Sequence, residues 1–405
     1  MVAVEQARGP LAGIRIVEFA GLGAAPYGVM LLADLGADVV RIDRPGAGSD
    51  PGVLAHVAVW RGRRSVVIDL KHPEASAPVG RLLDGADVLV EGFRPGTMER
   101  LGFGPEAILP TRPGLVYARM TGWGQDGPLA RTAGHDLNYA ALSGALHTVG
   151  PEGQPPPPVV NYLADLGGGG MLLAVGVLAA LVERERSGLG QVIDAAMVDG
   201  AASLTTFVRG LSALGAWGDR RGSNLLDGGA PFYATYRCAD GRDMAVAAIE
   251  PQFFREFVEG FGLSEEFVGL QHDRARWPEL RRVFAERFAS RPRDFWAERF
   301  AGADACVTPV LALDEVHDHP HHVARRTFGV PLSGPLPEGI SGSPMPAPAP
   351  RMSRTPPEVR HGAPTAGAHT REVLVGAGLG EAEVDDLVAR GVVVEAPPDE
   401  LRARG

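Results

Sequence analysis

The sequence predicts an α/β protein: a large domain with a Rossmann-like parallel sheet, and a smaller α+β domain. Two observations predict this class. Short apolar runs alternate with helical stretches in the first half of the chain, and a separate segment of two strands followed by helices begins at Pro231. The 405 residues allow two to three domains, and a hydrophobic fraction of 45% is enough for an ordinary core.

The large domain opens with a strand, a turn, a helix and a second strand. Ile14–Phe19 is rich in strand-forming residues, Gly21–Pro26 is a turn, Tyr27–Leu35 has helical spacing, and Ala37–Ile42 is again strand-like. This order is a βαβ unit, whose two strands pair in parallel.

Three more apolar runs continue the pattern, at Val66–Ile68, Val88–Val90 and Leu115–Ala118. Strands that alternate with helices form a parallel sheet covered on both faces, so residues 1–195 are assigned to the large domain. The apolar run Met171–Val182 is expected to be a buried core helix, because it is too short to cross a bilayer.

A change of pattern follows the large domain. Val192–Thr206 has helical spacing, and the small residues and turn formers around and beyond it predict a linker over 196–230. The smaller domain is expected over 231–319, where two strands are joined by a turn at Asp240-Gly241. Three amphipathic helices come next, at Phe253–Phe261, Trp277–Phe288 and Asp294–Phe300.

The last part of the chain is expected to return to the large domain. Residues 320–335 are assigned to a second linker, and the Pro, Ser and Gly of Pro331–Pro357 predict an extended segment. Helical patterns at Thr370–Leu374 and Glu381–Arg390 assign residues 336–405 to the large domain.

The formal net charge of −10 limits the partners of the protein. An acidic chain repels phosphate backbones and anionic lipids, so neither nucleic acid nor a membrane is expected as a partner. The two cysteines, Cys238 and Cys306, are too few for a disulfide framework. With no apolar run of signal-peptide length at the N-terminus, a cytoplasmic location is expected.

The turn after the first strand nearly matches the dinucleotide-binding motif, which makes a dehydrogenase the first alternative. Asp43 ends the next strand, as an acidic residue does in that motif. However, Pro26 occupies the position where glycine or alanine allows close packing of helix on strand. Arg41 and Arg44, which flank Asp43, suit a phosphate better than a ribose.

Basic residues gather in the first hundred positions. Arg44, Lys71 and Arg94 each follow a predicted strand, at the edge of an α/β sheet where ligands bind. Their convergence indicates a small polyphosphate ligand, and a solvated surface with scattered cations is an equally good interpretation of the pattern alone. Lys71 is the only lysine in the chain. Further basic residues of this region include Arg41, Arg61, Arg63, Arg64 and Arg100.

Two further segments carry groups able to move protons. His135 lies in the sequence GHDLNY, and Asp165 precedes four consecutive glycines, Gly167–Gly170. A structural histidine and a helix-capping aspartate are the alternatives. The glycines allow another backbone or a ligand to approach closely, and a helix start beside the carboxylate would suit the stabilisation of an oxyanion.

Two weaker signals come from the second half of the chain. Glu250 lies at the end of a predicted strand where a helix begins, which by itself is unremarkable. The histidine-dense stretch His317–His322 could hold a metal, but a proline interrupts it and the helical pairing of zinc-binding histidines is missing, so a solvated linker is favoured.

Taken together, these segments resemble the α-methylacyl-CoA racemases, a family within the family III (CaiB/BaiF type) CoA-transferase superfamily. The resemblance covers essentially the whole chain, and the segments GHDLNY and AIEPQFF are typical of the racemase branch. Other matching segments are PLAGIRIVEFAGLGAAP, ADLGADVVRIDRP, GRRSVVIDLKHP, EGFRPGTMERLGFGP, GQVIDAAMVDG and LDGGAPFY.

The resemblance implies racemisation of 2-methylacyl-CoA thioesters in lipid and fatty acid metabolism, by proton transfer through an enolate. It implies that His135 and Asp165 are the catalytic acid/base residues and that Glu250 supports His135. No metal or organic cofactor is expected, because coenzyme A is part of the substrate. The implied CoA- and substrate-binding residues are Arg44, Ile68, Asp69, Leu70, Lys71, Arg94, Gly134, Asp136, Leu137, Asn138 and Tyr139.

The resemblance also implies an interlocked homodimer, in which each chain threads through its partner and the active site lies between the large domain of one subunit and the small domain of the other. The expected donors to the enolate oxygen are backbone N–H groups near Asp165 and the glycine run. A CoA transferase, which would use Asp165 as a nucleophile to form an aspartyl–CoA thioester, is the main alternative. A non-enzymatic CoA-binding protein is a third.

Overall fold

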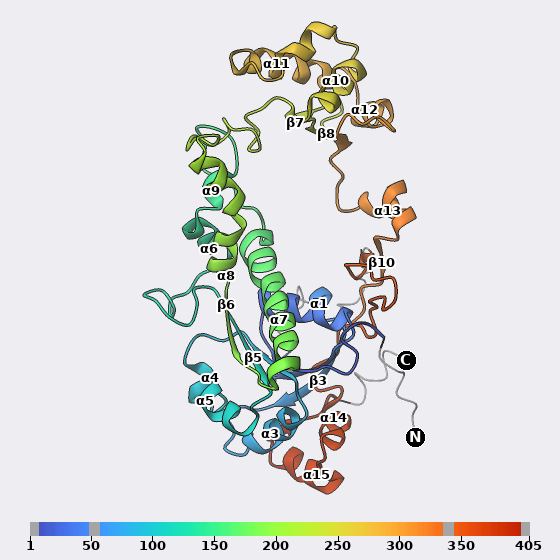
Figure 1. Ribbon diagram of the computed structural model, residues 1–405. Coiled ribbons are helices and arrows are strands. Elements are labelled where there is room, and N and C mark those ends of the chain that lie inside the picture. The colour runs from blue at the N-terminus through green and yellow to red at the C-terminus, as the bar shows by residue number, and fades with distance from the viewer. Residues whose placement is uncertain (1–7, 48–56, 335–343, 398–405) are drawn as a thin grey trace. The chain divides into compact units, whose positions relative to one another are not determined.

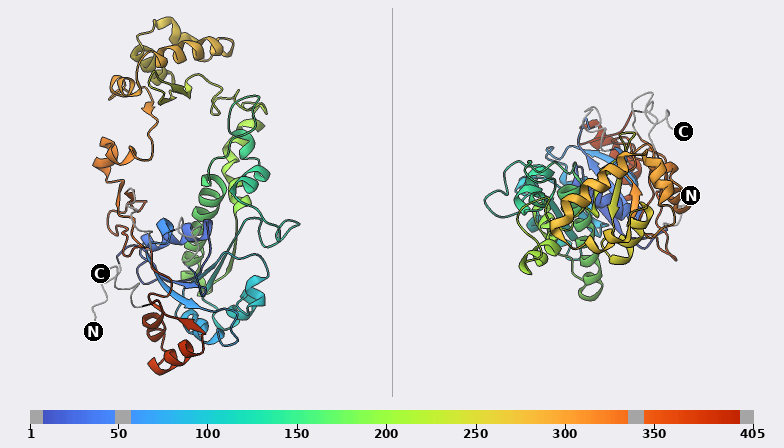
Figure 2. Two further views of the ribbon diagram at one scale, coloured as in Figure 1. Left: turned by 180° about the vertical axis from the view of Figure 1, so that it is seen from behind. Right: turned by 90° about the horizontal axis from the view of Figure 1, so that it is seen from above.

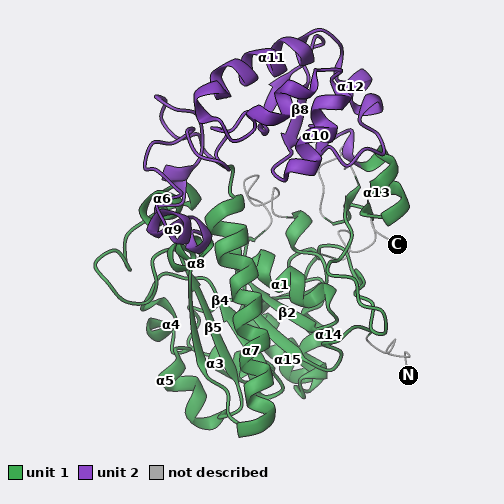
Figure 3. Cartoon of the chain, turned by 45° about the horizontal axis from the view of Figure 1, so that its top comes forward, with its two compact units in different colours: residues 1–143, 159–204, 317–405 green, residues 144–158, 205–316 purple. Residues whose placement is uncertain are grey.

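A computed structural model describes residues 8–47, 57–334 and 344–397. The chain divides into two compact units, which Figure 3 shows in green and purple. Unit 1 comprises residues 1–143, 159–204 and 317–405, and unit 2 comprises residues 144–158 and 205–316. Both units are therefore assembled from separate stretches of the chain, and the C-terminal stretch belongs to unit 1.

Unit 1 contains a seven-stranded sheet in the order β12-β3-β2-β1-β4-β5-β6. All of its neighbours pair in parallel except β12, which is antiparallel to β3. The predicted parallel sheet is thus confirmed. Its strands are β1 (Arg15–Phe19), β2 (Asp38–Asp43), β3 (Arg63–Ile68), β4 (Val88–Glu91), β5 (Val116–Thr121), β6 (Val192–Ala196) and β12 (Val393–Val394).

Helices cover both faces of this sheet. One core joins the sheet to α3 (Ser76–Asp84), α14 (Thr370–Gly376) and α15 (Glu381–Ala389). A second core joins it to α1 (Ala24–Asp34) and α7 (Leu172–Ser187), and Figures 1 and 2 show these two groups of helices. Most of these core residues are the apolar positions whose spacing predicted strands and helices.

The remaining elements of unit 1 are short. They are α4 (Thr97–Arg100), α5 (Pro105–Ile108), α6 (Asp136–Ser143), α8 (Met197–Leu204), α13 (Pro320–Arg325), β10 (Phe328–Val330), β11 (Met345–Pro346), the 3₁₀ turns Val57–Val59 and Leu109–Thr111, and the π-helix η4 (Tyr162–Met171).

Unit 2 is built on a three-stranded antiparallel sheet in the order β7-β8-β9, which confirms the predicted hairpin. Its core is dominated by aromatic rings from the sheet and from α10, α11 and α12. The elements are α9 (Thr206–Ala213), β7 (Tyr233–Arg237), β8 (Asp243–Ala247), α10 (Pro251–Gly260), α11 (Trp277–Ala289), α12 (Arg293–Arg299), β9 (Val307–Pro309) and the 3₁₀ turns Leu146–Thr148, Glu265–Leu270 and Arg274–Arg276.

Two expectations for the region after residue 190 were wrong. Val192–Ala196 forms the edge strand β6, not a helix, because it pairs with β5. The helix expected over Val192–Thr206 is confirmed only over α8, and the stretch expected to be a linker continues with a second helix, α9. Its small residues allow close helix packing, a tertiary effect that composition alone does not separate from a loop.

The expected buried helix is longer and less buried than its sequence indicated. Helical structure runs without a break over the 26 residues from Tyr162 to Ser187, and its most apolar 18-residue window has a mean hydropathy of 1.9, so by length and composition alone it could cross a membrane. It packs on the sheet and on α1, but 44% of its most apolar window is buried. Val175 and Val182 on its outer face are 58% and 64% exposed.

The Pro-rich segment Pro331–Pro357 is described only in part, since residues 335–343 lie outside the described residues. Where it is described, it contains the short strand β11, which pairs with β10.

Candidate active site

The carboxyl ends of the parallel strands collect three cations. Arg44 follows β2, Lys71 follows β3 by three residues, and Arg94 follows β4 by three residues. All three side chains are exposed. The order of strands reverses between β1 and β4, and ligands bind at such a switch point in open α/β sheets.

Most of the other basic residues of the first hundred positions hold the fold together. Arg41 pairs with Asp43 at 2.7 Å, Arg61 with Asp34 at 2.6 Å, and Arg63 with Glu18 at 2.6 Å, all of them buried. The guanidinium of Arg41 also lies 3.8 Å from the centre of the Trp60 ring. The expectation that Arg41 faces a phosphate was therefore wrong, because its side chain is buried and paired with Asp43 and Trp60.

The dinucleotide-binding alternative fails at Asp43. Its side chain is 2% exposed and accepts a hydrogen bond from the Ser65 hydroxyl at 2.6 Å, so it is not available to a ribose. Pro26 lies in the first turn of α1, where a missing N–H costs nothing.

The segment Ile68–Lys71 turns away from the sheet immediately after β3. Ile68 is buried as the last residue of the strand. The Asp69 carboxylate accepts the N–H of Lys71 at 3.0 Å, while the N–H of Asp69 donates to the carbonyl of Val392 at 2.9 Å. This turn holds the backbone of Lys71 and leaves its ammonium in solvent.

His135 lies in a well-braced turn before α6. Its N–H donates to Asn138 Oδ1 at 3.1 Å, and its carbonyl accepts the N–H of Asn138 at 2.8 Å. The Tyr139 hydroxyl donates to the carbonyl of Gly134 at 2.5 Å, and the edge of its ring meets Trp123 at a centroid distance of 4.7 Å. The His135 side chain itself is exposed.

The position of Asp165 in the sequence indicated a helix cap, but the structure shows that Asp165 does not cap a helix. It is the fourth residue of the π-helix η4, and Asn161 is the N-cap residue. The N–H of Leu166 donates to the carbonyl of Asn161 at 3.2 Å, a bond across five residues that defines this wider turn. π-Helical turns occur frequently at functional sites, and periodicity gives no signal for them.

The first backbone N–H groups of the π-helix are bound by Asp136. Its Oδ1 accepts the N–H of Ala164 at 2.7 Å and the N–H of Asp165 at 2.8 Å. The expected use of N–H groups next to Asp165 as donors to an enolate was wrong for these two, because Asp136 occupies both.

The glycine run serves backbone packing. A Cβ atom on Gly168 would lie 2.6 Å from Ala201 N, and one on Gly200 would lie 1.7 Å from Gly168 O. A Cβ atom on Gly170 would meet the carbonyl of Ala24 at 2.7 Å. The π-helix is thus pressed against both α8 and α1, which sets the position of Asp165.

The Asp165 carboxyl faces a mixture of apolar surroundings and charges. A Cβ atom on Gly23, the N-cap residue of α1, would lie 3.6 Å from Asp165 Oδ2. The pKa of Asp165 is raised to about 6, first by burial and then by the negative charge of Asp136, whereas His135 and a hydrogen bond with Asn161 oppose the rise. This pKa falls within the range where imidazole side chains ordinarily titrate, so the group suits both acid and base roles near neutral pH.

A cavity of about 230 Å³ opens beside His135. Among the predicted site residues, it is lined by Arg94, Gly134, His135 and Tyr139. The sequence interpretation did not name Trp123 and Met197 as site residues, although both line the cavity. Leu137 and Asn138 are exposed in the first turn of α6.

A second hollow, of about 440 Å³, lies on the other side of Arg94. Arg94, Arg100 and Arg131 line it together. Arg131 was not predicted, because it is distant in sequence from the other two cations.

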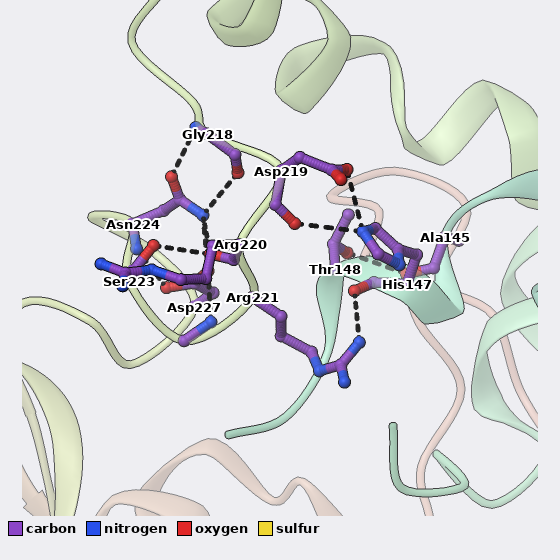
Figure 4. A network of polar contacts seen from close by, with 11 residues as sticks. Ala145, His147, Thr148, Gly218, Asp219, Arg220, Arg221, Ser223, Asn224 and Asp227 are labelled. Carbon is purple, nitrogen blue, oxygen red and sulfur yellow. Dashed lines mark hydrogen bonds and ion pairs between the residues drawn. The ribbon is translucent and has the colours of Figure 1, made fainter. Parts of the chain in front are cut away.

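In unit 2, Glu250 is the N-cap residue of α10, with no side-chain hydrogen bond to the helix, and is exposed. Hydrogen bonds to Asp227 connect the start of LDGGAPFY to the loop before it. Asp227 accepts N–H groups of Gly222, Asn224 and Gly229 at 2.8 to 3.1 Å, and Figure 4 shows Arg221 and Asp219 of the same loop bound to His147.

The histidine-dense stretch shows no metal site. Among the described residues, no group of three or more His, Cys, Asp or Glu side chains is arranged to hold a metal ion.

Comparisons with known proteins agree with one another. Residues 11–370 match the family described as CoA-transferase family III. The chain is 45% identical over 97% of its length to 99% of the alpha-methylacyl-CoA racemase of Mus musculus. It is 31% identical over 90% of its length to 88% of the succinyl-CoA–L-malate CoA-transferase alpha subunit of Chloroflexus aurantiacus. A crystal structure of a CAIB/BAIF family protein from Brucella suis matches with a TM-score of 0.77 and 25% identity, over 91% of this chain and 100% of that one.

Proposed function

This chain belongs to CoA-transferase family III, and from that membership we infer that it is an isomerase that interconverts the 2R and 2S forms of 2-methylacyl-CoA thioesters. The observation that carries the inference is the 45% identity to a racemase over almost the whole of both chains. The candidate site supports it, because His135 and Asp165 are both proton-transferring groups and are linked through Asp136.

Racemisation requires the removal of a weakly acidic α-proton and the return of a proton to the opposite face of a planar enolate. His135 and Asp165 are proposed as the two bases, one holding a proton when the other does not. The raised pKa of Asp165, about 6, suits this exchange of roles, because a carboxyl group of ordinary pKa is a poor acid at neutral pH.

The N–H groups of Ala164 and Asp165 are bound to Asp136, so the enolate oxygen needs other donors. Within the described part of the chain, the N–H groups of Asp136 and Leu137, at the start of α6, have no acceptor. The first N–H groups of a helix are unpaired and carry partial positive charge. We assign the stabilisation of the enolate to this helix start, next to His135. Since protein groups supply both proton transfer and charge stabilisation, the proposal requires no metal or organic cofactor.

Coenzyme A is proposed to bind along the carboxyl edge of the sheet, held by Arg44, the segment Ile68–Lys71 and Arg94, with the thioester near Gly134–Tyr139. The exposed cations on this edge support the proposal, since an acidic protein needs a local basic rim to hold a small polyphosphate. Arg61 and Arg63, by contrast, form buried ion pairs inside unit 1 and serve the fold.

Replacing Lys71 by Arg is expected to raise the KM for a 2-methylacyl-CoA about fivefold, or about 1 kcal/mol, with the melting temperature unchanged. Arginine keeps the positive charge of the side chain but replaces the compact ammonium group with a planar guanidinium. As Lys71 is the only lysine, an amine-directed acylating reagent modifies one side chain and the N-terminal amine. Coenzyme A should protect that side chain from modification, which mass spectrometry of the peptide measures. Equal modification with and without coenzyme A would remove Lys71 from the site. Arg186→Lys, an exposed change in the last turn of α7, is the control, because its added amine should be modified equally with and without coenzyme A.

We further propose the interlocked homodimer of the racemase branch, with Glu250 of a second subunit supporting His135. Exposed apolar side chains on α7 and the use of both chain ends in unit 1 support it. The expected mass in solution is twice 42.6 kDa. Interlocked subunits carrying different tags should form mixed dimers only after unfolding, and rapid mixing under native conditions would contradict the interlocking. A cytoplasmic location remains part of the proposal.

The decisive experiment uses one enantiomer of a 2-methylacyl-CoA and the enzyme in deuterated water. Racemisation with incorporation of deuterium at the α-carbon is the expected result. Exchange of CoA between carboxylates without α-deuteration would instead establish a transferase that uses Asp165 as a nucleophile. Binding of acyl-CoA with neither reaction would establish a non-enzymatic CoA-binding protein.

A further inference from the structure

One buried carboxylate between the two proposed bases has no part in the proton transfers described above. Asp136 follows His135 directly, begins α6, and is 6% exposed. Its Oδ1 holds the N–H groups of Ala164 and Asp165 at 2.7 and 2.8 Å. The Asp136 side chain thus connects the turn that carries His135 to the backbone of Asp165, which lies 29 positions after Asp136.

The geometry points to Asp136 as a positioning residue of the proposed racemase. It holds the π-helix so that Asp165 keeps its place relative to His135, and its negative charge helps Asp165 to retain a proton near neutral pH. This inference rests on the proposed function, in which Asp165 must act both as an acid and as a base.

The position of the π-helix depends on Asp136 because Asp136 holds two of its first backbone N–H groups, whereas Asn161 bonds to the Asp165 side chain. Asn161, its N-cap residue, makes no side-chain hydrogen bond to the helix backbone. Buried N–H groups that lose their acceptor cost free energy, so the two bonds to Asp136 favour one conformation of the turn. A displacement of about 1 Å at a reacting group can lower a rate by about 10²-fold.

The charge acts on Asp165 from short range. Asp136 is the strongest neighbouring charge that raises the pKa of Asp165, after burial itself. The other ionisable groups near Asp165 are His135, whose charge lowers that pKa, and Tyr139, whose own pKa is raised by burial and by the Asp165 charge.

The helices packed on η4 add no comparable charge. Asp199 of α8 is exposed, the ionisable residues of α7 begin at Glu183 in its last turns, and α1 has Tyr27 against Gly170 and the paired Asp34 at its far end. Asp136 is therefore the neighbour whose removal should change the titration of Asp165 most.

The test compares Asp136→Asn with Asp136→Ala. The amide oxygen of asparagine can still accept both N–H groups but carries no charge. For Asp136→Asn, the acidic limb of the kcat/KM profile should move to lower pH by roughly one unit, because a carboxyl group that loses a negative neighbour stays ionised to lower pH. Asp199→Asn, an exposed change on α8, should leave the limb in place.

Asp136→Ala removes the acceptor as well. Hydrogen–deuterium exchange of the amides of Ala164 and Asp165 should become at least tenfold faster than in the parent, whereas Asp136→Asn should keep parental exchange. The kcat at the pH optimum should be about 10²-fold lower in the alanine variant than in the asparagine variant. This exchange measurement needs no turnover, so it remains informative if the alanine variant is inactive.

An acidic limb that stays in place in Asp136→Asn, or parental amide exchange in Asp136→Ala, would overturn the inference. A parent enzyme that exchanges no α-proton at all would instead refute the proposed function. The α-deuteration assay reports that result separately from the two tests of Asp136.

Discussion

Asp165→Asn is expected to lower racemisation of a 2-methylacyl-CoA by about 10²- to 10⁴-fold, the range that one general acid/base contributes. Asparagine keeps the shape of the side chain but can neither take nor release a proton under these conditions. In deuterated water, His135 should still remove the α-proton from one of the two enantiomers. That enantiomer should therefore exchange its α-proton without changing configuration, while the other should not exchange.

His135→Gln should give the mirror result, with exchange confined to the opposite enantiomer. Chiral separation combined with mass spectrometry of the recovered thioester measures both quantities. His147→Gln and Asp219→Asn alter an exposed pair in unit 2 and serve as matched controls. Exchange of the same enantiomer in both variants would refute the two-base assignment, and parental racemisation by either variant would remove that residue from catalysis.

Gly200→Ala is expected to cost about 3 kcal/mol of stability, the upper end of the usual range for overpacking, and to abolish racemisation at the same time. The added Cβ atom would lie 1.7 Å from the carbonyl oxygen of Gly168, which is backbone and has no rotamer to adopt. The two helices must separate, and the π-helix that carries Asp165 moves with Gly168. Urea unfolding and the α-deuteration assay measure the two effects.

The matched control is Gly376→Ala at the end of α14, where a Cβ atom would meet nothing within 4 Å. This variant should be as stable as the parent or slightly more so, because alanine favours a helix over glycine. A stable and fully active Gly200→Ala protein would show that α8 does not set the position of the π-helix.

Several parts of the candidate site were foreseeable from local sequence. His135 belongs to a segment typical of one branch of a family, Asp165 precedes a run of four glycines, and Arg44, Lys71 and Arg94 follow strands whose apolar runs were evident. A parallel sheet places the ends of such strands along one edge, so their common location follows from the βαβ pattern. The match to relatives at up to 45% identity agrees with that interpretation.

Other parts depended on partners far away in the chain. Arg41 and Arg63 looked like members of the same basic cluster as Arg44, yet Asp43 and Glu18 bury them in ion pairs. Val192–Ala196 became a strand because β5 offered an edge to pair with. Hydrophobic periodicity predicts the structure of a segment only when its pattern fits one kind of packing partner. The pattern of this segment fitted more than one.

The sequence by itself determined the type of sheet, the family and the residues able to move protons, because these depend on residue identity and on spacing within about ten positions. Only the tertiary structure decided how those groups are held. The structure shows a π-helix around Asp165. Two contacts between residues about 30 positions apart hold it: Asp136 accepts its N–H groups, and Gly168 packs against Gly200. Such contacts arise when helices pack at the distance their backbones allow, and that distance is a property of the folded core rather than of any one segment.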